Sequence, residues 1–99
     1  MSNTKDTLAY FLKKIGNSTR ISTKVEMNEC TLYAEGKPVA VICDDLLYVP
    51  VCPASVSLDS LCEVSVPYLG AKQHYVISEE QVAEIHTLSK ILLSIAKST

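Results

Sequence analysis

The chain has 99 residues, a length that accommodates one domain with one core, so we expect a single domain over residues 1–99. Its 47% apolar and 20% charged residues are typical of a folded globular domain and exclude an intrinsically disordered chain. Nine basic and eleven acidic residues give a formal charge of −2, and the lysines are scattered, which argues against direct binding to nucleic acid.

The N-terminal segment MSNTKDTLAY lacks the apolar run of about 7–15 residues that a signal peptide needs. No stretch reaches the roughly 18 apolar residues of a membrane span. We therefore expect a cytoplasmic protein that makes no membrane contact. In that compartment we expect the cysteines to be buried free thiols rather than two disulfides; they are Cys30, Cys43, Cys52 and Cys62.

The first predicted element is a helix over about residues 5–15. Apolar residues recur there at the spacing of one helical face, at Leu8, Phe11, Leu12 and Ile15. Gly16 is suited to end the helix because glycine readily adopts the left-handed conformation of a C-cap.

Four short strands are predicted next, over Ile21–Met27, Thr31–Ala34, Val39–Cys43 and Leu46–Val49. Tight turns separate the last three. Gly36 in the Glu35–Gly36 pair can adopt the positive φ of a hairpin, and short carboxylate side chains such as Asp44 and Asp45 bond their own backbone. The apolar VAVIC run predicts that the third strand is central and nearly covered on both faces.

The segment from Ala54 to Cys62 is compatible with either a short helix or a loop. A bend with proline and glycine follows over Val66–Lys72, and His74–Ile77 resumes strand character as a fifth strand.

Ser78, with Gln81 three residues later, forms a capping box that opens a final helix. An apolar stripe continues from there at steps of three and four, through Val82, Ile85, Leu88, Leu92 and Ile95. We predict one long helix whose broad apolar face covers the sheet. The alternative use of the stripe is to dock a partner or a second copy of the chain.

Together these elements predict an α+β domain with an antiparallel sheet of about five strands. The expected order is helix, four-strand meander, short helix or loop, fifth strand and long helix, with both long helices packed on the sheet.

Two segments carry a spaced run of landmarks, LYAEGKPVAVICDDLLYV and VPYLGAKQHYVI. In order and spacing they resemble the TfoX N-terminal domain family over about half of the chain. The chain departs from the family where Asn28, Glu29 and Cys30 replace glycines, and where Leu69 and Gln73 replace prolines.

The resemblance implies a fold similar to secretion-chaperone-like α+β proteins. It also implies a link to competence regulators, whose full-length members carry a second, helical domain and promote transcription together with a cyclic-AMP receptor protein. Single-domain members are mostly of unknown function, and no residue set in the two segments forms a recognisable catalytic or cofactor site.

Asp44 and Asp45 are the most suggestive chemical pair, because adjacent carboxylates can hold a divalent cation or act as acid and base. A tight turn explains them fully, and we favour that interpretation. The cysteines with His74 and His86 show no paired ligand spacing, so we predict no metal site.

The Pro67–Tyr75 bend gathers Tyr68, Lys72, His74 and Tyr75 around a glycine. Such a composition could line a ligand or peptide groove. The alternative, which we favour, is a structural crossover whose tyrosines pack on the sheet.

We therefore predict a non-enzymatic regulatory or protein-interaction domain without cofactor, which binds a protein partner or forms a homodimer. A dimer could use the sheet edge or the first helix. The alternative is a small-molecule-binding or enzymatic domain that uses the Pro67–Tyr75 bend with Asp44 and Asp45.

Overall fold

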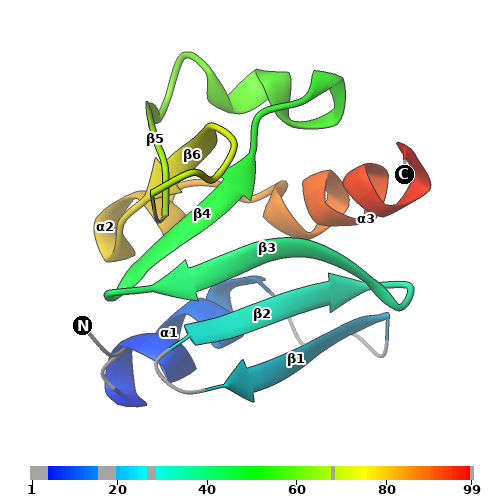
Figure 1. Ribbon diagram of the computed structural model, residues 1–99. Helices are drawn as coiled ribbons and strands as arrows, with labels where there is room; N and C mark the ends of the chain where they lie inside the picture. Colours follow the sequence, from blue (N-terminus) through cyan, green and yellow to red (C-terminus); the bar gives the residue numbers. More distant parts are fainter. Residues whose placement is uncertain (1–4, 16–19, 27–28, 68, 99) are drawn as a thin grey trace.

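One antiparallel sheet of six strands, with helices on one of its faces, makes up the fold (Figure 1). The computed structural model describes residues 5–15, 20–26, 29–67 and 69–98. Its helices are α1 (Lys5–Ile15), the 3-10 helix η1 (Pro53–Leu58), α2 (Glu79–Val82) and α3 (Leu88–Ser98). Its strands are β1 (Ile21–Glu26), β2 (Glu29–Ala34), β3 (Lys37–Cys43), β4 (Leu46–Pro50), β5 (Glu63–Ser65) and β6 (His74–Ile77).

The spatial order of the strands is β1-β2-β3-β4-β6-β5, and every neighbouring pair is antiparallel. The predicted α+β class and the four-strand meander are confirmed. The sheet has six strands rather than about five, because Glu63–Ser65 pairs with β6. Three residues are too few to show a strand periodicity, so this strand gave no signal in the sequence. The two edges of the sheet are β1 and β5.

Both predicted two-residue turns are present and use the left-handed region of backbone space. Glu35 and Gly36 have φ of 53° and 79°, and Asp44 and Asp45 have φ of 54° and 62°. Paired positive φ angles give the turn twist that matches a right-twisted hairpin. Aspartate tolerates this region better than most residues, which is why Asp44–Asp45 can make the turn without glycine.

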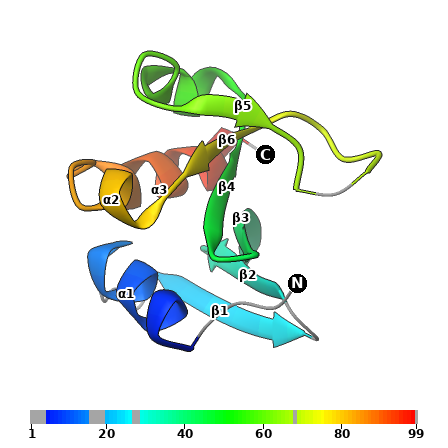
Figure 2. The same ribbon diagram turned by 90° about the vertical axis from the view of Figure 1, so that its left-hand side faces the viewer.

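The core lies between the sheet and the helices, which occupy the same side of the sheet (Figure 2). Alternate residues of the strands point into it and are buried, among them Leu32, Ile42, Leu47, Val49 and Ile77. Helix α1 contributes Phe11 and Ile15, as its spacing predicts. Full burial of one such side chain stabilises the fold by about 1.5–3 kcal/mol.

The prediction of one continuous final helix is wrong, whereas the prediction that its apolar stripe is buried is confirmed. The chain forms α2 and α3, separated by residues 83–87. Every residue of the predicted stripe is buried, but α2 packs against α1 whereas α3 packs against β3 and η1. No glycine or proline marks the break. Packing against two different elements requires the change of direction, which residue spacing alone cannot show.

None of the described helices lies on the opposite face of the sheet, and the prediction that β3 is nearly covered on both faces is wrong. Ile42 is buried on the helix side, whereas Val41 and Cys43 point to the open face and are only half-buried. The segment that joins β5 to β6 projects on this open side (Figure 2). None of the described helices is long and apolar enough to cross a membrane.

A β-bulge bends β3 away from β4. Ala40 pairs with Leu32 and Pro38 pairs with Tyr33, so the intervening Val39 has no partner in β2. Such an extra residue bends its strand and increases the local twist. Strand β4 accordingly pairs with β3 only over Val41–Cys43. Helix α3 packs against β3, where Lys37 Nζ donates to Ala96 O at 3.3 Å.

Candidate functional site

Asp44 and Asp45 lie in the β3–β4 turn, as the turn interpretation predicts. Their adjacent positive φ angles serve the hairpin, and Asp44 is exposed while Asp45 is half-buried. Among the residues that the structure describes, no group of three or more His, Cys, Asp or Glu side chains could hold a metal ion.

The residues of the Pro67–Tyr75 bend separate onto different sides of the sheet. Lys72 is exposed, and its carbonyl oxygen lies 2.7 Å from His74 Nδ1. His74 lies edge-on to the ring of Tyr48, with ring centroids 6.5 Å apart. Tyr75 points to the core instead, where its hydroxyl donates to Asp59 Oδ1 at 3.4 Å. Tyr68 lies outside the described residues.

The structure does not bring the aspartate turn and the bend together. The turn precedes Leu46 at one end of β4, whereas His74 pairs with Pro50 at the other end. Four residues of strand separate the two ends by about 13 Å. Of the described candidate residues in the bend, Lys72 and His74 are in contact, whereas Tyr75 points to the core.

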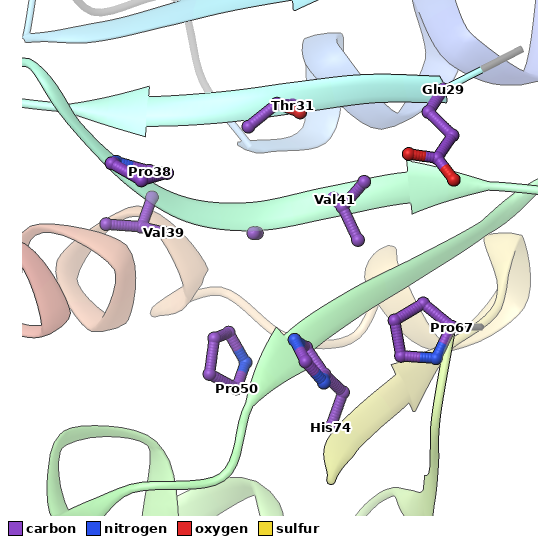
Figure 3. A pocket seen from close by; sticks show the side chains of 9 residues that line it. Glu29, Thr31, Pro38, Val39, Val41, Pro50, Pro67 and His74 are labelled. Atoms are coloured by element: carbon purple, nitrogen blue, oxygen red, sulfur yellow. The ribbon is translucent and has the colours of Figure 1, made fainter. Parts of the chain in front are cut away.

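A hollow of about 240 Å³ opens on the open face where β3 bends away from β4 (Figure 3). Its apolar lining consists of Pro38, Val39, Ala40, Val41, Pro50 and Pro67. Its polar lining consists of Glu29, Thr31 and His74. The hollow is smaller than the roughly 300–1,000 Å³ typical of ligand pockets. Residue spacing could not predict it, because it results from the bulge at Val39.

All four cysteines are free thiols, and only Cys30 is fully buried. Burial raises the pKa of the Cys30 and Cys62 thiols. Burial and the nearby Glu29 carboxylate both raise the pKa of the Cys43 thiol. A raised pKa keeps a thiol protonated at neutral pH and therefore weakly nucleophilic. The expectation of a buried thiol is wrong for Cys43, because Cys43 alternates with Ile42 and points to the open face, where it is only half-buried.

An exposed apolar set near the β5 edge is the feature that the sequence interpretation missed. Seven large apolar side chains are exposed among the described residues, and six of them lie between positions 51 and 69. This apolar set consists of Val51, Val56, Leu61, Val64, Val66 and Leu69. Val56 is 61% exposed and Leu61 is 58% exposed, and both lie in the segment Ala54–Cys62 that was compatible with either a short helix or a loop.

A buried serine explains why Val56 points outward. Ser55 has no exposed surface, accepts from the Cys52 N–H at 3.1 Å, and donates to Pro50 O at 2.6 Å. Because this hydroxyl satisfies two backbone groups of the turn, it occupies the inward position that an apolar residue would usually take. Val56 follows it in the 3-10 helix and faces out.

Several contacts hold the segment around η1 in place. Gln81 Nε2 donates to Leu61 O at 3.0 Å, and Val51 N donates to Gln73 O at 3.1 Å. Helix α3 packs against η1 from the core side. The apolar set is thus presented by a segment that is bonded to the body of the domain.

Comparison with models of protein families, with curated proteins and with solved structures found no match to this chain.

Proposed function

We propose that this chain is a non-enzymatic regulatory or protein-interaction domain that binds a protein partner through the apolar set at its β5 edge. The observation that carries the proposal is the concentration of exposed apolar side chains between positions 51 and 69. Single exposed apolar residues are common on protein surfaces, whereas six of them along one short segment offer a partner several apolar contacts.

The hydrogen bonds that hold this segment in place indicate an ordered binding surface rather than a flexible segment whose apolar residues are exposed by chance. A segment that is already held by main-chain and side-chain hydrogen bonds loses little conformational freedom when a partner binds. Its exposed side chains therefore gain apolar contact at a small entropic cost.

The resemblance to the TfoX N-terminal domain family supports the same class of function. Full-length members act as regulators together with another protein, and the present chain shares landmarks only with the N-terminal part. A role in competence regulation is the most specific form of the proposal.

The test compares three forms of the tagged domain in extracts of its native host. A triple variant, Val56→Thr, Leu61→Gln and Val64→Thr, removes apolar contact at exposed positions. Val25→Thr is the matched control, because Val25 is 62% exposed at the opposite edge of the sheet. Bound proteins are quantified by mass spectrometry.

We expect a stoichiometric partner with the unaltered domain and the control, and a loss of at least about tenfold with the triple variant, since 1.4 kcal/mol of binding free energy corresponds to a factor of ten. Equal recovery by all three forms, or no stoichiometric protein with the unaltered domain, contradicts the proposal. Circular dichroism verifies that each variant is folded.

The hollow beside His74 supports a second candidate function, the binding of a small molecule. Pro67 and His74 from the predicted bend line it together with β3, whereas Asp44 and Asp45 do not. Native mass spectrometry of the domain purified from its host tests this alternative. A co-purifying compound that is retained by the triple variant and lost in His74→Ala would support it.

A further inference from the structure

The outer edge of β1 lacks most of the features that protect a sheet edge, and its charged residues are Lys24 and Glu26. Strand β1 has six residues, contains no proline, and pairs with β2 in unbroken register from Ile21–Ala34 to Glu26–Glu29. No described segment pairs with its outer side, since β1 ends the strand order. Natural proteins usually protect such an edge by shortness, proline, bulges or charge.

One hydrogen bond identifies which backbone groups point outward. Glu35 N donates to Arg20 O at 3.0 Å, so the backbone of Arg20 points toward β2. In an antiparallel pair the direction alternates from one residue to the next. The backbone N–H and C=O groups of Ile21, Thr23 and Val25 therefore point away from the sheet.

These three residues are arranged symmetrically about Thr23. Antiparallel pairing of two β1 strands centred on Thr23 places Thr23 opposite itself and Ile21 opposite Val25 of the second copy. Each of these is a hydrogen-bonded pair, so six main-chain hydrogen bonds form across the two-fold axis. A Thr–Thr pair and a pair of β-branched apolar residues are favourable cross-strand neighbours.

The register centred on Thr23 also gives the side chains favourable neighbours across the interface. Val25 is 62% exposed on the core side of the sheet, and the pairing covers it with Ile21 of the second copy. Lys24 falls opposite Ser22. The neighbouring register, centred on Lys24, places two lysines directly opposite each other, which is unfavourable, and leaves fewer outward groups paired within the described strand.

We propose that two copies of this chain form a homodimer in which the β1 strands pair antiparallel about Thr23, joining the two sheets into one. The two-fold axis is perpendicular to the sheet and keeps the helices of both copies on the same side. The proposal concerns the edge opposite the apolar set and is independent of the proposed partner.

Engineered disulfides test the register. Hydrogen-bonded antiparallel neighbours have Cα atoms about 5.5 Å apart, within the range of about 4.4–6.8 Å that a disulfide spans. Thr23→Cys should therefore yield a crosslinked dimer on mild oxidation. In Ser22→Cys the two introduced thiols are offset by two residues, with Cα atoms about 8 Å apart, so this variant should stay monomeric on denaturing gels.

The unaltered chain is the control for its four native thiols, and peptide mass spectrometry identifies the crosslinked residue. A crosslink that forms as readily with Ser22→Cys, or that forms with Lys24→Cys in place of Thr23→Cys, overturns the register. Failure of Thr23→Cys to crosslink overturns the proposal.

Sedimentation measures the dimer itself. The full chain should show a concentration-dependent monomer–dimer equilibrium. Thr23→Pro removes an outward N–H and is compatible with an edge strand, and it should raise the dimer Kd by about tenfold or more. Val25→Lys should weaken the dimer as well, whereas Val64→Lys at the β5 edge should leave it unchanged. A chain that stays monomeric at every concentration, or a Thr23→Pro variant that is folded and dimerises normally, overturns the proposal.

Discussion

The two edges of the sheet offer different chemistry to a partner. Strand β1 presents a regular row of outward backbone groups over six residues. Strand β5 has only three residues, and the neighbouring segments present apolar side chains instead. Main-chain pairing requires a matching strand and suits a second copy, whereas exposed side chains suit a partner with a complementary apolar surface. One small domain can therefore use both edges without competition between them.

The largest expected effect is a loss of stability at a buried core position next to β1, compared with an exposed position on β1 itself. Leu32→Ala in β2 should lower the free energy of unfolding by about 2–5 kcal/mol, because Leu32 is fully buried. Val25→Ala should change it by less than about 0.5 kcal/mol in the monomer, since exposed positions contribute little. Urea denaturation at low protein concentration measures both. A large loss of stability in Val25→Ala would show that the Val25 side chain makes stabilising contacts within the monomer, which contradicts a free β1 edge.

The next effect concerns the anchoring of the β5 edge. Ser55→Ala should lower the free energy of unfolding by about 1–3 kcal/mol, because it leaves partly buried backbone groups of Cys52 and Pro50 without their hydroxyl partner. Ser57→Ala, at an exposed position of the same helix, is the control and should be nearly neutral. Urea denaturation measures the loss, and hydrogen exchange should show faster opening of residues around η1. Unchanged exchange would contradict the role of Ser55 in holding the apolar set.

The next effect is a pH dependence of stability at Tyr75, which lies on β6 next to β5 and faces the core. Burial and the Asp59 carboxylate raise the pKa of the Tyr75 hydroxyl in the folded state. The unfolded chain then loses this proton at lower pH than the folded chain, so stability is present below pH of about 10 and falls as the pH rises further. Tyr75→Phe should remove this contribution to the loss of stability at alkaline pH. Thermal unfolding measured across the alkaline range tests it, and identical profiles for both forms would contradict it.

The smallest expected effect lies beside the start of β1, where Arg20 meets the turn between β2 and β3. Arg20 and Glu35 form an ion pair whose side chains are about half exposed. Such pairs contribute about 0–1 kcal/mol and are screened by salt. Glu35→Gln should therefore lower stability slightly at low ionic strength and negligibly at high ionic strength. Denaturation at two salt concentrations measures the difference, and a loss above this range would assign the turn a larger role at this edge.

Local patterns in the sequence predicted most of the elements correctly. The spacing of Leu8, Phe11 and Ile15 predicts α1 because one helical face must be apolar to reach the core. The Asp44–Asp45 turn follows from the conformational preference of aspartate, and the Ser78–Gln81 capping box follows from side-chain hydrogen bonding. Each of these depends on residues within a few positions of one another.

The candidate surfaces were harder to predict, because each depends on residues distant in the sequence. The hollow forms where the bulge at Val39 separates β3 from β4 and where Pro67 and His74 approach from other elements. The outward position of Val56 depends on the inward position of Ser55, which reverses the usual order of polar and apolar residues. Tyr75 joins the core because it lies on the same face of β6 as Ile77, which other elements cover, whereas His74 on the other face borders the hollow.

The sequence by itself determined most of the element types, the turns and the α+β class, because hydrophobic periodicity and local backbone preferences act over short distances. Tertiary structure alone decided where the final helix breaks, which strands form the edges, and which apolar side chains remain exposed. Those features follow from the placement of each element against its neighbours, which is a property of the whole packed chain. The β1 edge illustrates both levels, since its strand was predictable, while its place at the end of the described strand order was not.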